Sequence, residues 1–111
     1  MKDCIAPEER EGSCYHEFYR GEWDGVSFWK SDSLLLHDDI LGQRRGFVDA
    51  VLRVIPNYDS CGVTEVSREQ WVKIGKALPV GDKESRELYQ EIDAWAGEVF
   101  RSADCFSILG I

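Results

Sequence analysis

The side chains best suited to chemistry are two histidines and four cysteines, but their spacing matches no known site. Cys14 and His16 form the one close cysteine–histidine pair, and no CxxC, HExxH or CxxC…HxxxH pattern accompanies it. A zinc site needs three or four converging nitrogen and sulfur ligands. We therefore predict no metal site and interpret Cys4, Cys14, Cys61 and Cys105 as free thiols, because a chain of 111 residues does not need disulfides to form a core.

A second candidate for chemistry is the run His37-Asp38-Asp39. An imidazole beside two carboxylates would bind a divalent ion or perform acid–base chemistry if other ligands converged on it. The alternative is a polar helix N-terminus, where Asp38 and Asp39 face the positive end of the helix dipole. We favour the helix N-terminus and assign no catalytic residue.

Phosphate-binding and nucleophile motifs are also missing from the sequence, which contains no GxGxxG, GxxxxGK[ST] or GxSxG. We therefore predict no cofactor and no enzymatic activity. A small enzyme with a dispersed active site, built on His37 and nearby acids, is the least favoured of the alternatives.

The tryptophans are the side chains that point to binding, because large rigid aromatic rings often anchor protein interfaces. Trp71 and Trp95 lie on apolar helical stripes and are predicted to be core residues. Trp23 lies between Glu22 and Asp24 in a predicted loop, which is an arrangement suited to a surface rich in arginine or lysine.

The charge of the chain indicates the kind of partner. Twenty-one acidic residues against thirteen basic ones give a net charge of −8, which disfavours direct contact with nucleic acid or anionic lipid. A basic partner is the converse inference, and solubility alone is the simpler explanation. Residues 1–55 and 56–111 each carry −4, so an acidic face has to be assembled by folding.

Local patterns predict the elements that position these residues. Residues 1–12 read as a flexible N-terminal arm, followed by a single domain over 13–111. Predicted strands cover 15–19, 26–29, 63–66 and 105–109, the first two forming a hairpin, and residues 34–36 fit a short strand, which we favour, or a helix start. No run approaches the ~18 apolar residues of a membrane helix, and residues 1–12 lack the apolar core of a signal peptide, so we expect a cytoplasmic protein.

Three helices complete the prediction. The first spans about 40–55 and ends at Pro56, with Gly42 and Gly46 loosening its first turns. The second begins at the capping box of Ser67 and Gln70, and the third is capped by Asp82. The predicted fold class is α+β, with a small, mostly antiparallel sheet of about four or five short strands packed with three helices.

One stretch resembles a known family. Residues 56–71, PNYDSCGVTEVSREQW, with Asp38-Asp39 upstream, resemble bacterial polymorphic-toxin immunity proteins, among them those of contact-dependent growth inhibition. The resemblance is clearest over residues 37–75. Ser60 and Cys61 stand where that pattern often has an aromatic residue or a histidine.

The resemblance implies a small cytoplasmic protein that binds one cognate toxin domain, often a basic nuclease, and blocks its active site. The expected partner contacts are Trp23, Asp24, Asp38, Asp39, Asp59 and Glu65. Asp38 and Asp39 also fit a helix N-terminus, and Asp59 also fits a turn. The alternative function is an acidic adaptor or DNA mimic that regulates a host protein.

Overall fold

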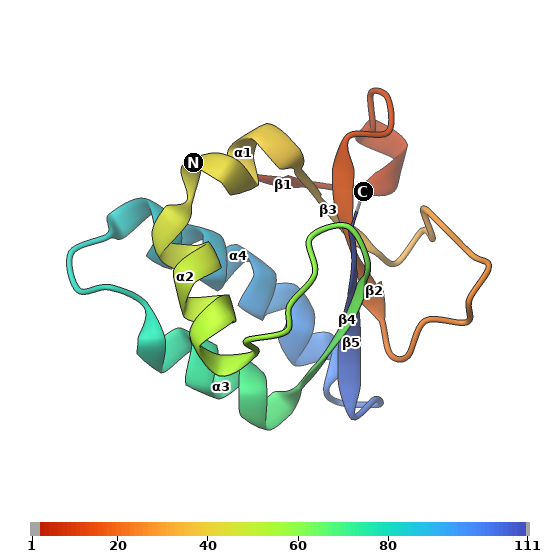
Figure 1. Ribbon diagram of the computed structural model, residues 1–111. Helices are drawn as coiled ribbons and strands as arrows, with labels where there is room; N and C mark the ends of the chain where they lie inside the picture. The colour runs from red at the N-terminus through yellow and green to blue at the C-terminus, as the bar shows by residue number, and fades with distance from the viewer. Residues whose placement is uncertain (1–2, 111) are drawn as a thin grey trace.

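A five-stranded antiparallel sheet carries helices on one face and a long loop on the other (Figure 1). The computed structural model describes residues 3–110. The strands are β1 (Cys4–Ile5), β2 (Tyr15–Arg20), β3 (Leu34–His37), β4 (Val63–Ser67) and β5 (Cys105–Leu109), in the order β1-β3-β2-β5-β4. The helices are α1 (Asp38–Gln43), α2 (Arg45–Val54), α3 (Arg68–Ala77) and α4 (Lys83–Val99), with a 3-10 turn η1 (Pro7–Glu9). The predicted α+β class is confirmed.

Strand β2 lies inside the sheet and is covered on both faces. Its side chains alternate, as in any strand, and Phe18 belongs to the core beneath the helices together with Phe106 of β5 and Ile92 of α4. Tyr15, Glu17 and Tyr19 point to the opposite face, yet they are buried as well. Something other than the helices must therefore cover that opposite face.

The second and third predicted helices begin as their sequences indicate. The Ser67 hydroxyl accepts a hydrogen bond from the Gln70 backbone N–H, and the Gln70 side chain accepts one from the Ser67 N–H. Asp82 accepts from the Ser85 N–H at the start of α4. Trp71 of α3 is buried, as predicted, whereas Trp95 of α4 is only partly buried.

The first predicted helix is two helices, because the chain breaks at Arg44. Its backbone (φ −104°, ψ 59°) is not helical, and its buried guanidinium donates two hydrogen bonds of 3.0 Å to the carboxylate of Asp3. Gly46 lets α2 approach the turn before α4, since a Cβ there would lie 2.1 Å from the Asp82 carboxylate. A long-range ion pair thus redirects the helix.

The prediction that ordered structure begins near Ser13, after an arm over residues 1–12, needs correction. Cys4 and Ile5 pair with Leu36 and Leu35 as an edge strand. The Glu91 carboxylate of α4 accepts from the backbone N–H of Asp3 at 2.8 Å. Residues 3–5 are therefore attached to both layers, while residues 1 and 2 of the predicted arm lie outside the described part of the chain.

Candidate functional site

The outer face of the sheet is covered by residues 21–33, which we call the 21–33 loop (Figure 1). The predicted strand over 26–29 is wrong, because the loop's polar groups turn inward to Glu17 instead of pairing with a strand. The Glu17 carboxylate accepts from the N–H groups of Trp29 (2.8 Å) and Lys30 (3.1 Å) and from the Ser33 hydroxyl (2.6 Å). This buried carboxylate fixes the loop on the sheet.

Two of the predicted contact residues, Trp23 and Asp24, hold the tip of this loop together. Asp24 accepts from the Ser27 hydroxyl and from the N–H groups of Ser27 and Val26. The bonds to Ser27, followed by the one to Val26, lower the pKa of Asp24 to about 2. The Trp23 indole donates to the Ser27 carbonyl, and its ring packs on Phe28 with centroids 5.3 Å apart.

The exposed apolar residues of the loop are ones that sequence reasoning missed. Phe28 is 55% exposed and Val26 is 77% exposed, whereas Trp23 is half-buried. We assigned Val26 and Phe28 to a strand on their β propensity, so their exposure was not foreseen. The exposed aromatic side chain of this loop is therefore Phe28, and the half-buried Trp23 ring packs against it.

Asp38, Asp39 and Asp59 lie at a different place, around the start of α1 and the turn before β4. Asp38 accepts from Nε2 of the buried His16 at 2.8 Å. Asp39 lies in the first turn of α1, and its N–H donates to Nδ1 of His37, so His37 caps the helix.

Asp59 accepts from the N–H of Cys61 at 2.9 Å and closes the turn, as its alternative role predicts. Burial, then the charges of Asp38 and Asp59, raise the pKa of Tyr58 to about 12. Two of the predicted carboxylates therefore act on one tyrosine.

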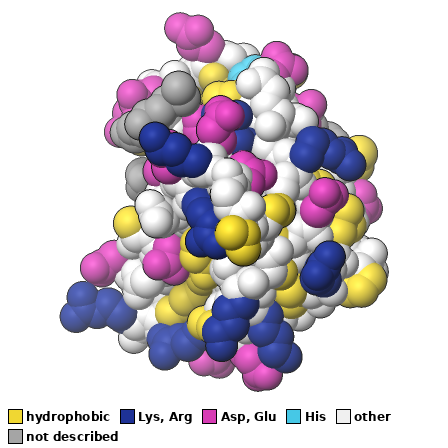
Figure 2. Space-filling view, turned by 90° about the vertical axis from the view of Figure 1, so that its left-hand side faces the viewer, with side chains coloured by type: hydrophobic (Ala, Val, Ile, Leu, Met, Phe, Trp, Pro, Cys, Tyr) yellow, Lys and Arg dark blue, Asp and Glu magenta, His cyan; other side chains and the backbone are white. Residues whose placement is uncertain are grey.

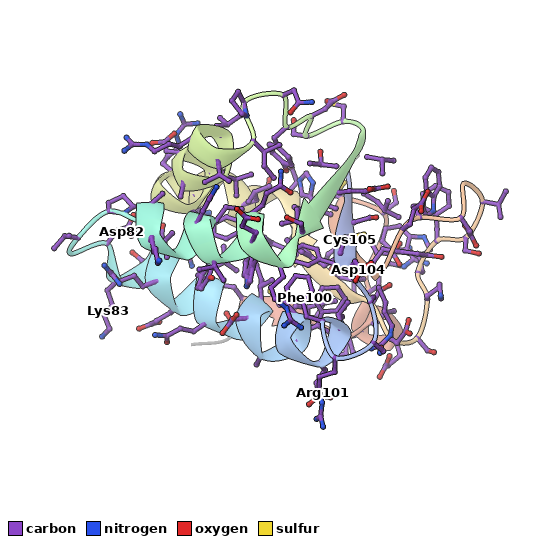
Figure 3. All side chains as sticks on the ribbon, turned by 90° about the horizontal axis from the view of Figure 1, so that it is seen from below. Asp82, Lys83, Phe100, Arg101, Asp104 and Cys105 are labelled. Carbon is purple, nitrogen blue, oxygen red and sulfur yellow. The ribbon has the colours of Figure 1, made fainter. Side chains whose placement is uncertain are left out.

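Glu65 belongs to a third place, the outer face of β4. Burial, then the charges of Glu65, Glu22 and Asp104, raise the pKa of the Cys105 thiol. Asp104 and Cys105 lie beside the end of α4 at Phe100 and Arg101 (Figure 3). The six predicted residues thus lie on the 21–33 loop, around α1 and the turn before β4, and on β4, where Glu65 acts on Cys105 together with Glu22 of the loop.

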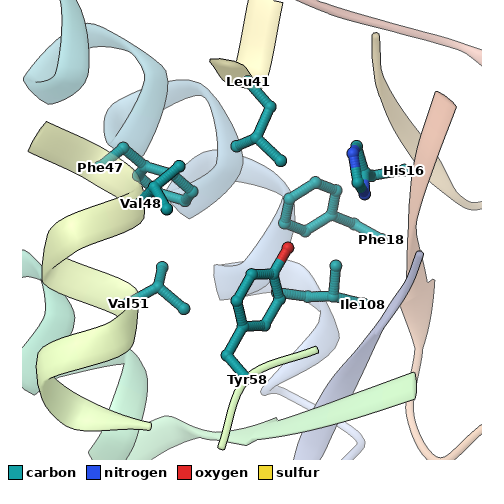
Figure 4. Close-up of a pocket in the computed structure, with 8 residues that line it drawn as sticks. All are labelled: His16, Phe18, Leu41, Phe47, Val48, Val51, Tyr58 and Ile108. Carbon is teal, nitrogen blue, oxygen red and sulfur yellow. The ribbon is translucent and has the colours of Figure 1, made fainter. Parts of the chain in front are cut away.

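Of the two histidines, His16 is fully buried and His37 is partly exposed. His16 lines a small cavity together with Phe18 and Tyr58, and its buried Nδ1 has no hydrogen-bond partner (Figure 4). The space, about 10 Å³, is the size of one water molecule and too small for a substrate. Within residues 3–110 no three His, Cys, Asp or Glu side chains converge as a metal site, and Cys14, Cys61 and Cys105 are free thiols.

The charge of the molecule is separated between its layers. We define the helix layer as residues 45–54 and 68–101, which contain α2, α3 and α4. It holds eight acidic and eight basic residues, interspersed on the surface in Figure 2. The rest of the chain, which we call the sheet side although it also contains the short helix α1 with Asp38 and Asp39, holds thirteen acidic and five basic residues and thus the whole net charge of −8.

The exposed acids of the sheet side outnumber its exposed bases. Eleven of its thirteen acids are exposed, and Asp3 and Glu17 are the two that are buried. Among the described basic residues of the sheet side, only Arg10 and Lys30 are exposed. The excess of exposed acids therefore lies outside α2, α3 and α4, which the even division of charge along the sequence does not show.

Comparison with known proteins identifies no relative: no family model, no curated protein and no solved structure matches the chain. Within residues 3–110, no helix is both long and apolar enough to cross a bilayer.

Proposed function

We propose that this chain is a cytoplasmic immunity protein, which binds and neutralises a cognate toxin domain, a basic nuclease being the expected target. The observation that carries the proposal is the separation of charge between the layers. The whole net charge of −8 belongs to the sheet side, which also presents the exposed Phe28 and Val26. The resemblance of residues 37–75 to immunity proteins points to the same function.

The proposed interface combines two contributions. Acidic side chains complement a cationic protein surface and favour encounter with it. Burial of an exposed aromatic side chain then slows dissociation, since full burial of a phenylalanine stabilises a complex by about 1.5–3 kcal/mol. Phe28 supplies such an anchor, and the bonds of Asp24 to Val26 and Ser27 hold the loop that presents it.

The direct test is co-expression with a candidate toxin domain, sought in the gene upstream of the one that encodes this chain. We expect restored growth and a complex that co-elutes on size-exclusion chromatography. Absence of both would remove the immunity function. A complex with a host regulator in place of a toxin would favour the adaptor or DNA-mimic alternative.

A pair of charge-reversal variants tests which layer binds. Glu65→Lys with Asp104→Lys changes two exposed acids of the sheet side. Asp49→Lys with Glu69→Lys makes the same change of net charge on the helix layer, at residues whose exposed ion pairs with Arg45 and Lys73 stabilise little. We expect the first variant to weaken toxin binding at least tenfold, about 1.4 kcal/mol, and the second by less than threefold. Equal losses would contradict a sheet-side interface.

A further inference from the structure

A groove of about 200 Å³ lies between the 21–33 loop and the outer face of β2 and β5. Phe28 and Trp29 line it from the loop, Tyr15 and Glu17 line it from β2, and Leu109 lines it from β5. Ser13 and Gly110 complete the lining. Three of these seven residues are aromatic, and the charged side chain among them is a carboxylate.

The carboxylate of Glu17 gives the groove a negative charge that water cannot screen well. Glu17 is 1% exposed, and charge interactions are stronger in such a low-dielectric environment than in bulk water. Its two oxygens accept three hydrogen bonds in total, from Trp29, Lys30 and Ser33, out of about four that a carboxylate can accept. The group is therefore held firmly and still attracts a cation.

The aromatic lining suits a planar cation in particular. Guanidinium groups stack on aromatic faces, and arginine does so more often than lysine. The Trp29 ring already carries such a contact, because the guanidinium carbon of Arg10 lies 4.5 Å from its centroid. Phe28, with 55% of its surface exposed, has room for another.

The backbone at Trp29 shows that the groove is maintained at a cost. Trp29 has φ of 59°, the left-handed region that a tryptophan rarely adopts. Such a conformation is strained and persists where surrounding contacts determine it. Here the hydrogen bond from the Trp29 N–H to Glu17 holds it.

We propose that this groove receives an arginine side chain of the basic partner, stacked against Phe28 and attracted by Glu17. The inference rests on the proposed function and identifies the partner group that the sheet side recognises. The net charge of −8 on that side supports a cationic occupant over an apolar one.

The test uses Nα-acetyl-arginine amide as the probe and Nα-acetyl-citrulline amide, which has nearly the same shape and no charge, as its control. Both are titrated at equal ionic strength into the ¹⁵N-labelled protein. We expect saturable NMR shifts, with a dissociation constant in the millimolar range, at the Trp29 and Gly110 amides and the Trp29 indole. The citrulline probe should bind at least tenfold more weakly.

Two variants locate the site. Phe28→Ala removes an exposed wall of the groove and should weaken the arginine probe about threefold or more. Val80→Ala truncates an equally apolar side chain, 95% exposed, in the helix layer and should change nothing. Three results would overturn the proposal. They are equal binding of the two probes, an unchanged affinity of the arginine probe after Phe28→Ala, and NMR shifts centred on Asp38 or Glu65.

The outcome can be separated from that of the co-expression test. Groove binding by the arginine probe without a toxin complex would retain the arginine site and remove the immunity function. If the protein forms a toxin complex but the arginine probe does not bind the groove, the proposed arginine site is wrong and the immunity function is retained.

Discussion

Replacing Glu17 by glutamine tests whether one buried carboxylate holds the 21–33 loop in place. The carboxylate accepts three hydrogen bonds, whereas a glutamine amide has one acceptor oxygen and an NH₂ group that donates. At least one of the three donors would then face another donor. A hydrogen bond to a charged group contributes about 1.5–3 kcal/mol, so we expect the free energy of unfolding to fall by about 2–3 kcal/mol.

This loss translates into a measurable change in melting temperature. Unfolding entropy is about 2.1 cal/mol/K per residue, which for 111 residues gives roughly 4 °C per kcal/mol. Calorimetry should therefore show the Glu17→Gln variant melting about 8–12 °C lower. Glu22→Gln, at an exposed position in the same loop, is the matched control and should shift the free energy of unfolding by less than about 0.5 kcal/mol.

Hydrogen exchange distinguishes release of the loop from general weakening. The Trp29 and Lys30 amides should lose protection beyond the global loss of stability, whereas the amides of Phe18 and Ile108 in the sheet should follow the global change. A melting temperature within 2 °C of the wild type, or unchanged exchange at Trp29, would refute the anchoring role of Glu17.

Two further predictions concern other buried groups. Asp3→Ala removes the carboxylate that pairs with Arg44, a residue that is 6% exposed, and leaves its guanidinium beside the exposed Glu84 at 3.3 Å. Urea unfolding should therefore show that the free energy of unfolding falls by about 3 kcal/mol. A fall of less than 1 kcal/mol would contradict the role of this pair in attaching β1. Tyr58 has a folded pKa of about 12 against about 10 when unfolded, so its contribution is complete below pH 10 and is lost as pH rises towards 12. The stability of the wild type relative to Tyr58→Phe should therefore fall by about 1–2 kcal/mol between pH 9 and 11.5, and a constant difference in chemical unfolding would count against burial as the cause.

The elements that could be predicted from the sequence are those whose signals are local. The capping box at Ser67 and the cap at Asp82 lie within four residues of the helices they begin. Strand β1 gave no such signal, because two residues show no periodicity and their attachment depends on Arg44 and Glu91, far away in the chain. Strand propensity is also misleading over residues 26–29, where the hydrogen bond from the Trp29 N–H to Glu17 fixes a backbone that is not extended.

For the candidate surface, the sequence predicts the local structure around several residues but not their contacts with distant parts of the chain. The sequence predicts correctly that Trp23 and Asp24 lie in a loop outside the strands. In the structure both side chains form hydrogen bonds within that loop and so help to hold its conformation. Asp38 was expected at a helix start, and its bond to the buried His16 could not be inferred from residues so far apart. Separation of charge by layer was invisible in the sequence, because each half of the chain contributes to both layers.

The position of β5 determines when this fold can be completed. Residues 105–109 lie between β2 and β4, so Glu17 pairs with Leu109 across nearly the whole chain. Contacts so distant in sequence close late and slow folding. Until these five residues have been synthesised, β2 and β4 each have an unpaired edge, which is a template for aggregation. A nascent chain must therefore wait for β5, because without that strand β2 has an open edge that the finished sheet covers and β4 has no partner in the sheet.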